Sequence, residues 1–378
     1  MITSIEISGF KRFSQLAMEL APLTVLTGTN GAGKTSVIHA LLLCREACRE
    51  GATTVQLNGP FGLELGSAAD VLNIHAAADA DAAHISITLS MTGGRVARFT
   101  FDAHEETLLY LPIVPPLDPS ADGGQLAFAR SNRIFTYLCA ERLGPRDVLG
   151  ASAQSTEDLT VGTRGEYCAQ ILEVQGLKMK VPSARRHPSH REEADAFLKY
   201  QVERWLTDIV RPIEIDTVAF ANTAVTALRF RAPSGEWVRA PNMGFGVSYA
   251  LPVVLAGLFM EEEGLLVVEN PEAHLHPAGQ SRMGTFLALV AASGVQVLLE
   301  THSDHVLNGI RRAIGEQRCL EAGAAVVHFF DQGSEEQPLV SKLSFTALGG
   351  LDKWPRRFFD QYQIDVAALA HVRRGSVS

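Results

Sequence analysis

A glycine-rich segment near the start of the chain has the spacing of a phosphate-binding loop. Residues 28–35 read Gly-Thr-Asn-Gly-Ala-Gly-Lys-Thr, between a short apolar run and a predicted helix. Glycines let backbone N–H groups wrap a phosphate, and the helix N-terminus adds a favourable dipole. Lys34 would reach the β- and γ-phosphates, and the Thr35 hydroxyl would bind Mg²⁺. The segment predicts ATP and Mg²⁺ as cofactors, held by Gly28, Asn30, Gly31, Gly33, Lys34, Thr35 and Ser36.

Such a loop needs a distant acid at the end of a neighbouring strand. Four apolar residues, 265–268, are followed by Glu269, and this pattern is typical of a buried strand that ends in a carboxylate. A carboxylate there can hold Mg²⁺ or its waters, so Glu269 is a predicted metal ligand. The alternative is an ordinary strand-to-loop boundary with solvated acids.

Two further segments add groups that could contact phosphate. Gly244, Gly246 and Ser248 lie just before a predicted helix and offer a second anion-binding surface. His302 follows another predicted strand and can reach a terminal phosphate. A plain helix-start turn and a helix-capping segment are the alternatives for these two segments.

The elements that must position these residues alternate between strands and helices at both ends of the chain. Apolar patterns predict strands over residues 2–8, 23–26, 265–269, 295–300 and 324–330, and helices over 35–49 and 248–260, from 279 and from 304. In the middle they predict strand pairs over 84–91 with 95–101 and 213–220 with 224–231, helices over 131–142 and 191–210, and a loop over 111–124. The expected class is α/β, with a mostly parallel P-loop sheet and a mixed α+β insertion between its two halves.

Composition narrows the setting of this chain. Its 378 residues are 46% hydrophobic and 20% charged, as in globular proteins. Lys+Arg 33 against Asp+Glu 42 gives a net charge of −9, so contact with nucleic acid requires a local basic patch. Five scattered cysteines with no Cys-x-x-Cys pair indicate a reduced, cytoplasmic protein. No apolar run approaches the roughly twenty residues that span a bilayer, so no membrane association is expected.

One stretch of the predicted insertion has the local charge that nucleic-acid binding needs. It contains Lys178, Lys180, Arg185, Arg186 and Arg191. These residues could contact phosphates or an acidic partner, although the stretch lacks the aromatic residues that stack on bases. The alternative is a solvated loop.

The order of these motifs resembles ABC-type ATPases of the RecF/SMC/OLD-related intracellular branch. The resemblance rests on the P-loop, the Gly-rich signature, the acid-ended strand followed by Pro-Glu and His-Leu-His-Pro, and a final Thr-His-Ser-Asp. Residues 7–13, Ile-Ser-Gly-Phe-Lys-Arg-Phe, also resemble that branch and imply that Lys11 and Arg12 lie near the nucleotide. Residues 351–360 resemble a short domain of unknown function that follows a subset of these ATPases in bacteria.

The resemblance implies an ABC-ATPase head of two lobes that dimerises around two ATP molecules. It divides the chain into an N-terminal ATPase lobe (1–110), an insertion (111–240), a C-terminal ATPase half (241–345) and a tail (346–378). Each ATP would lie between the P-loop of one copy and the signature of another, so a homodimer or higher oligomer is expected. Family members couple ATP to DNA transactions, often in antiphage defence and beside a nuclease. The chain after Asp304 is too short for a nuclease domain, so any effector would be a separate protein.

This sequence departs from the family pattern at the hydrolytic positions. Glu269 stands where Asp is usual, and Asn270 stands where a catalytic Glu is usual. An amide cannot take a proton from water, so Glu272 is the alternative base and turnover should be slow. Gln56 is a candidate for the family's metal-contacting glutamine, selected by its spacing alone.

Two other functions stay open at this stage. Asn270 could leave a nucleotide-sensing scaffold in which ATP only holds an assembly together. Alternatively, four histidines could form the metal site of a hydrolase or nuclease; they are His274, His276, His302 and His305.

Overall fold

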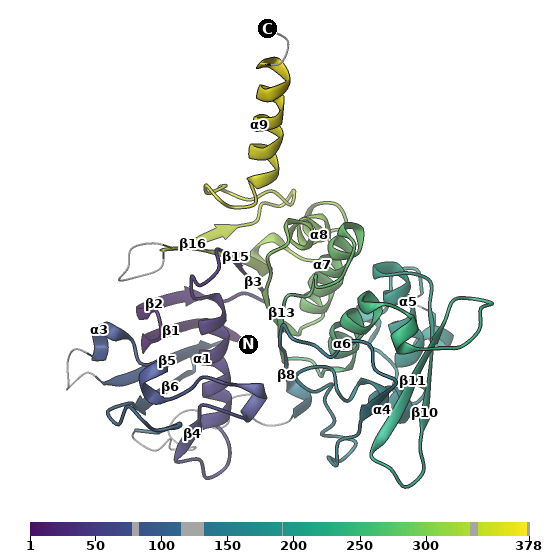
Figure 1. Ribbon diagram of the computed structural model, residues 1–378, viewed down its shortest axis with the longest axis horizontal. Coiled ribbons are helices and arrows are strands. Elements are labelled where there is room, and N and C mark those ends of the chain that lie inside the picture. The colour runs from purple at the N-terminus through teal and green to yellow at the C-terminus, as the bar shows by residue number, and fades with distance from the viewer. Residues whose placement is uncertain (78–82, 115–131, 191, 333–338, 376–378) are drawn as a thin grey trace.

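A six-stranded sheet forms the centre of the computed structural model, which describes residues 1–77, 83–114, 132–190, 192–332 and 339–375 (Figure 1). The strand order is β16-β15-β3-β14-β13-β8, and every neighbouring pair is parallel except β15 with β16. The strands are β3 (Leu23–Gly28), β8 (Phe135–Leu138), β13 (Leu265–Glu269), β14 (Gln296–Glu300), β15 (Ala325–Asp331) and β16 (Leu339–Ser344). Residues of β13 and β14 are buried throughout, as expected for strands covered on both faces.

The N-terminal lobe covers one face of this sheet. It contains α1 (Lys34–Ala47) and an antiparallel sheet of order β2-β1-β5-β6. Its strands are β1 (Ile2–Phe10), β2 (Phe13–Glu19), β5 (His84–Met91) and β6 (Val96–Asp102). One hydrophobic cluster joins α1, this sheet and one face of the central strands, so the lobe and the central sheet share a core.

Helices cover the opposite face of the central sheet. They are α6 (Phe245–Phe259), α7 (Pro277–Ala292) and α8 (Asp304–Gly315), with α4 (Cys168–Gln175) and α5 (Leu198–Ile209) beyond them. A small antiparallel sheet continues outward (Figure 1), with β9 (Val148–Gly150), β10 (Glu214–Ala219), β11 (Val225–Arg231) and β12 (Val238–Arg239). A second hydrophobic cluster runs through these helices and into the central sheet.

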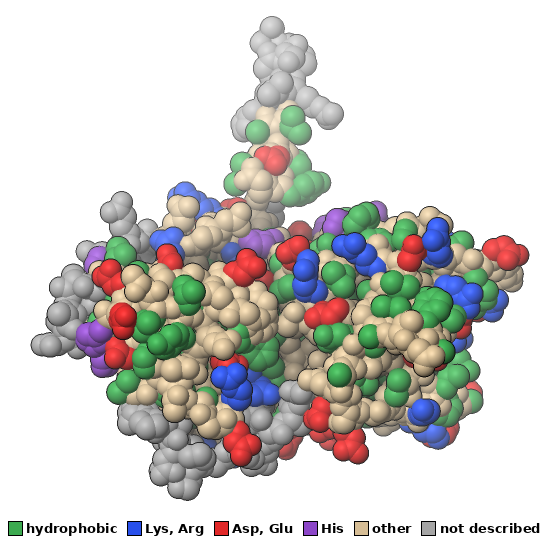
Figure 2. Space-filling model, turned by 60° about the horizontal axis from the view of Figure 1, so that its bottom comes forward, with side chains coloured by type: hydrophobic (Ala, Val, Ile, Leu, Met, Phe, Trp, Pro, Cys, Tyr) green, Lys and Arg blue, Asp and Glu red, His purple; other side chains and the backbone are tan. Residues whose placement is uncertain are grey.

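Smaller elements complete the described chain. They are β4 (Thr54–Gln56) paired with β7 (Tyr110–Pro112), α2 (Ala68–Val71), α3 (Ile74–Ala77) and 3₁₀ turns at Pro60–Gly62, Asn132–Ile134, Ser183–Arg185, Glu193–Asp195, Ala240–Asn242 and Ala322–Ala324. The last helix, α9 (Gln361–Gly375), projects from the body of the molecule (Figure 1 and Figure 2). Within the described ranges, no helix combines the length and apolar character needed to cross a bilayer.

The expected α/β class with a mostly parallel sheet is confirmed, but the middle of the chain differs from expectation. The helix predicted over residues 131–142 is wrong, because Phe135–Leu138 form a buried strand at the edge of the central sheet. A four-residue apolar run does not by itself distinguish a buried strand from a helix. The helix predicted from residue 191 begins at Leu198. One strand from residues 111–240, β8, therefore lies in the central sheet.

Most of the loop expected over residues 111–124 lies outside the described residues. Residues 111 and 112 belong to β7, and the description stops at residue 114.

Candidate nucleotide-binding site

The carboxyl ends of three neighbouring parallel strands meet at one edge of the central sheet. β3 runs into the glycine-rich loop, β13 ends at Glu269 and β14 ends at Glu300. Open parallel sheets bind their ligands at this edge, because the loops there diverge and leave a crevice. The predicted loop and acid are thus brought together by strand order alone.

The backbone of the glycine-rich loop explains two of its glycines. Gly28 has φ +136°, and a Cβ there would lie 1.9 Å from the Phe330 carbonyl oxygen on β15. Gly33 has φ +103°, and its Cβ would lie 2.6 Å from the Phe13 ring. Both positions need glycine for conformation and for space, so the loop can wrap tightly over the start of α1.

Lys34 is held inside this loop. It is 4% exposed, and its Nζ donates to the Gly28 and Thr29 carbonyl oxygens at 3.1 and 2.8 Å. Burial lowers the pKa of Lys34, and Glu300, 3.9 Å away, opposes that shift. The ammonium group is thus fixed where the motif requires a cation for phosphate.

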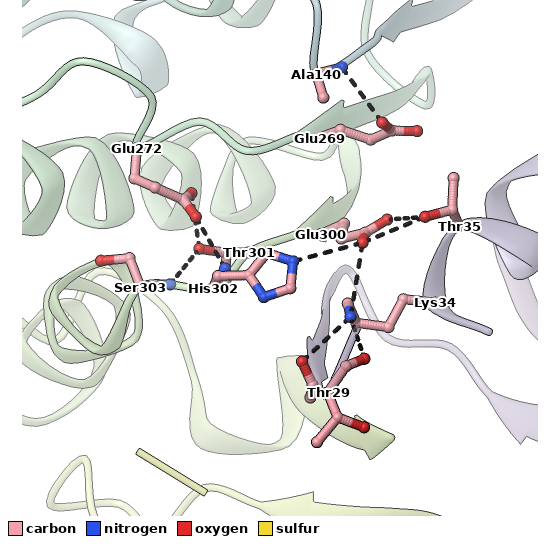
Figure 3. A network of polar contacts seen from close by, with 11 residues as sticks. Thr29, Lys34, Thr35, Ala140, Glu269, Glu272, Glu300, Thr301, His302 and Ser303 are labelled. Carbon is pink, nitrogen blue, oxygen red and sulfur yellow. Dashed lines mark hydrogen bonds and ion pairs between the residues drawn. The ribbon is translucent and has the colours of Figure 1, made fainter. Parts of the chain in front are cut away.

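The loop opens onto a hollow of about 370 Å³. Its lining contains eight of the residues predicted to bind nucleotide or catalyse, and also Glu300. The full lining is Arg12, Asn30, Gly31, Gly33, Lys34, Thr35, Ser36, Glu300 and His302. Figure 3 shows Lys34 and Thr35, at the start of α1, facing Glu300 and His302, at and just after the end of β14.

Glu300 is the carboxylate that contacts Thr35, and the sequence analysis did not select it. Thr35 Oγ1 donates to its two oxygens at 3.0 and 3.3 Å, and His302 Nε2 lies 4.0 Å from it (Figure 3). The signal was present, because Glu300 ends a predicted apolar strand just as Glu269 does. Strand order decides which of these two carboxylates lies beside Thr35, and no local pattern encodes it.

Glu269 lies beside Glu300 but makes different contacts. The two residues are partners in the parallel register of β13 and β14, so their side chains leave the same face of the sheet. The Tyr137 hydroxyl donates to Glu269 at 2.9 Å, and the Ala140 N–H donates at 3.2 Å. Glu269 therefore makes no direct contact with Thr35, and it stands one strand farther from the loop than Glu300 does.

The two carboxylates disfavour each other's charge. Burial, and then the nearby Glu269, raise the pKa of Glu300 to about 7, although Lys34 and Thr35 act in the opposite direction. Burial also raises the pKa of Glu269, against its hydrogen bonds from Tyr137 and Ala140. A divalent cation would offset this repulsion. Carboxylate and hydroxyl oxygens are the donors that Mg²⁺ prefers, so this set fits Mg²⁺.

Asn270 and Glu272 follow Glu269 and have separate environments. Asn270 has φ +44°, and Arg142 Nη2 donates to its carbonyl oxygen at 2.5 Å. Its side-chain oxygen is buried without a hydrogen-bond partner in the described part of the chain. Glu272 accepts from Thr301 Oγ1 and from the His302 N–H, both at 2.8 Å. Glu272 thus fixes the segment that carries His302, and this contact engages both of its oxygens.

Of the two basic residues predicted near the nucleotide, Arg12 reaches the hollow. Its Nη1 donates to the Gly31 carbonyl oxygen at 2.7 Å. Lys11 instead points to His39 on α1, with Nζ and Nδ1 2.8 Å apart. Burial lowers the pKa of Lys11.

The remaining predicted site residues lie elsewhere on the chain. Gly244, Gly246 and Ser248 lie at the start of α6 and do not line the hollow. Gln56 lies on β4, where it pairs with Tyr110, and it does not line the hollow either. The structure therefore gives no support to its predicted role at the metal. In the described residues, the suggested histidine set does not form a metal-binding group; that set was His274, His276, His302 and His305.

The fold leaves few side chains of the basic stretch available to bind nucleic acid. Arg185 is 1% exposed and donates to the carbonyl oxygens of Gly257 and Met260, so its predicted contact with nucleic acid is wrong. Lys180 and Arg186 both pair with Glu193. Lys178 is exposed, and Arg191 lies outside the described residues.

Comparisons with known proteins agree with this architecture. A family model described as "AAA domain, putative AbiEii toxin, Type IV TA system" matches residues 173–308, and one described as "AAA ATPase domain" matches residues 1–86. No curated protein matches the sequence.

Solved structures with a similar fold include SMC head domains. An SMC head from Pyrococcus furiosus, bound to the C-terminal domain of ScpA, aligns with a TM-score of 0.50 at 9% identity, over 98% of this chain and 99% of that one. The Thermotoga maritima SMC head aligns with a TM-score of 0.43 at 11% identity, over 90% and 98%. The sequence motifs, the nucleotide-site geometry and the two family models together support an ABC-type P-loop ATPase of the RecF/SMC/OLD type.

Proposed function

We propose that this protein binds ATP and Mg²⁺, hydrolyses ATP slowly, and dimerises around the nucleotide. One observation carries the proposal: the hollow under the glycine-rich loop combines a fixed cation, an oxygen donor set and a histidine. Lys34 would contact the β- and γ-phosphates. Thr35, Glu300 and Glu269 would hold Mg²⁺ or its waters, and the ion would neutralise charge that develops on the transferred phosphoryl group.

Residues of the hollow and of the segments beside it would then have distinct tasks. Arg12 and Lys34 orient the phosphates, while burial keeps bulk water away from Lys34. His302 stands where it can contact the terminal phosphate, and Glu272 positions it through the backbone. Asn270 can orient water but cannot accept its proton, so proton removal is the step expected to limit the rate.

Dimerisation would complete the site. The signature residues Gly244 and Phe245 are exposed at the start of α6, and Phe245 is 53% exposed. They do not line the hollow of their own chain. In the proposal they close over the phosphates bound by a second copy, where the helix N-terminus supplies N–H donors.

A phosphate-release assay under saturating ATP tests the catalytic part. The wild type should turn over well below the roughly 1–100 s⁻¹ of kinases. Lys34→Ala should lose both ATP binding and turnover, whereas Lys178→Ala, a matched change at an exposed lysine, should lose neither. Asn270→Glu should accelerate hydrolysis by restoring a base. Wild-type turnover that survives Lys34→Ala would exclude the proposed site.

A nucleotide-sensing scaffold is the second candidate, and the contacts of Glu272 favour it. The alternative base is already bonded to Thr301 and to the His302 N–H, so it is not free to take a proton from water. ATP would then hold the dimer without being consumed. Tight ATP binding with no phosphate release, unchanged in Glu272→Gln, would support the scaffold over the slow enzyme.

For the biological setting, we propose a cytoplasmic regulator of a separate effector that acts on nucleic acid, in bacterial antiphage defence. The description of one matching family model refers to a type IV toxin–antitoxin system, which is in keeping with such a role. Nucleic acid itself could meet the exposed Lys178, but Lys180 and Arg186 would first have to leave Glu193. Co-purification with the products of neighbouring genes tests this setting.

A further inference from the structure

A second group of potential metal ligands lies in the N-terminal lobe, apart from the ATP hollow. It consists of His84, Asp102 and His104, and the nearest ligand atoms of the three side chains all lie within 4.8 Å of one another. In the described part of the chain this is the single group of three or more histidine, cysteine or acidic residues with that property.

The strand register produces this convergence. His84 begins β5 and pairs directly with Asp102, which ends the antiparallel strand β6. Paired residues point to the same face of a sheet, and a residue two positions along an extended chain points there again. His104 is two positions beyond Asp102. The open end of the β5–β6 hairpin therefore presents three donors on one half-exposed face.

The hydrogen bonds within the group leave oxygen and nitrogen lone pairs that could bind a metal ion. Asp102 Oδ1 accepts from the His104 N–H at 2.9 Å and lies 2.5 Å from His104 Nδ1. Both contacts use Oδ1, which leaves Oδ2 as a second oxygen donor. His84 Nδ1 is buried and has no hydrogen-bond partner in the described part of the chain. A buried ring nitrogen without a partner is costly, and a bound ion would satisfy it.

We propose that His84, Asp102 and His104 bind a divalent transition-metal ion, with Zn²⁺ as the ion best suited to the donors. Two imidazoles and one carboxylate match the three protein ligands of an open zinc site, with water in the fourth position. Ligand atoms about 2.1 Å from a tetrahedral ion lie about 3.4 Å apart, so the Asp102–His104 contact would open by about 1 Å. The ion would join the two ends of the hairpin and stabilise the lobe that carries the P-loop.

Zinc titration of the chelator-treated full chain, without ATP and with excess Mg²⁺, tests this proposal. Mg²⁺ should occupy the oxygen donors of the ATP hollow and not compete for imidazole. The wild type should bind one Zn²⁺ by calorimetry and gain thermal stability. Co²⁺ should give the intense visible bands of a tetrahedral site.

Three variants decide the outcome. His84→Ala and His104→Ala should each weaken Zn²⁺ binding by more than about 100-fold, since even loss of an outer-shell partner costs about 10–100-fold. His75→Ala removes an exposed histidine of the same lobe and should bind as the wild type does. His104 is exposed, so its replacement keeps the test valid should His84→Ala not fold. Wild-type Zn²⁺ affinity in His104→Ala, or no stoichiometric binding at all, would overturn the site.

Discussion

At the scale of single residues, the two strand-end carboxylates make different contacts, which would give them different roles toward a bound Mg²⁺. Glu300 contacts Thr35 directly, whereas Glu269 is bonded to Tyr137 and Ala140. This arrangement makes Glu300 the nearer ligand for an ion held by Thr35. Glu269 would then act on the ion through water or through its charge.

We expect Glu300→Gln to weaken ATP binding in the presence of Mg²⁺ by at least about tenfold, which is about 1.4 kcal/mol. Glutamine can still accept from Thr35 but removes the negative charge that holds the cation. ATP binding in EDTA should be unchanged or tighter, because one charge that repels the phosphates is gone. Calorimetry with and without Mg²⁺ measures both, and Glu262→Gln at an exposed position is the control. Equal losses under the two conditions would contradict a metal role.

Glu269→Gln should act mainly on stability. The two donors, Tyr137 and Ala140, each use a different oxygen of Glu269. Glutamine keeps only one of these oxygens, because the other becomes an NH₂ group that cannot accept a hydrogen bond. A buried donor left without an acceptor costs about 1–3 kcal/mol of unfolding free energy. Urea unfolding of Glu269→Gln beside Glu300→Gln checks this prediction. A larger loss of unfolding free energy in Glu300→Gln would contradict it.

At the scale of elements, the junction of β3 and α1 depends on a glycine that has no room for a side chain. In Gly28→Ala, the new Cβ would clash with the Phe330 carbonyl on the neighbouring strand. Neither backbone can move without breaking the ladder between β3 and β15, so we expect a loss of more than about 3 kcal/mol.

Gly31→Ala is the matched control, because its Cβ would meet nothing within 4 Å. That residue has φ +72°, so alanine there should cost only about 1–2 kcal/mol of backbone strain. Denaturant unfolding of both variants compares the two positions. Equal losses would show that strain, and not the contact with β15, sets the requirement for glycine.

The packing of α1 against the end of β1 should make stability depend on pH. Burial, and then the nearby Lys11, lower the pKa of His39 to about 3, from 6.5 in an unfolded chain. Between these values the unfolded state binds more protons, so the free energy of unfolding should fall as pH falls from 6.5 towards 3. The slope from this residue is at most about 1.4 kcal/mol per pH unit.

Thermal unfolding between pH 4 and 7 measures that slope. His39→Gln cannot gain the proton and should flatten it, while His75→Gln on the surface should not. A wild-type slope in His39→Gln would place the dependence on other groups.

At the scale of the whole molecule, the hollow and the signature belong to separate parts of one chain. In the ATP-bound dimer, Ser248 would face the phosphates held by the other copy. Ser248→Arg should therefore block closure by its size and charge, while each monomer still binds ATP.

Light scattering after gel filtration, with and without ATP and Mg²⁺, measures this effect. The wild type should double in mass with ATP and the variant should not. Ser183→Arg, at an exposed position outside both motifs, should behave as the wild type. A mass that does not respond to ATP in any of the three would contradict a dimer closed by nucleotide.

Local pattern alone was enough to predict the P-loop, the α/β class and most elements of the ATPase halves. These patterns lie within a few consecutive residues. The glycine spacing in residues 28–35 predicts a phosphate-binding loop, and apolar runs such as 265–268 predict strands without regard to which strand they pair with. Lys34, Thr35 and His302 were selected in this way, and Arg12 was selected through the family resemblance. All four line the hollow.

Tertiary structure decided what depends on which segments become neighbours. Glu300 became the partner of Thr35 because β14 lies between β3 and β13, and no local pattern encodes strand order. Arg185 is buried and donates to two carbonyl oxygens at the C-terminal end of α6. It is therefore not part of a basic surface, although the sequence shows only that it carries a positive charge. Phe135–Leu138 became a strand because β13 offers an open edge. In each case a long-range contact outweighed the local preference, because pairing and burial act between residues far apart in the chain.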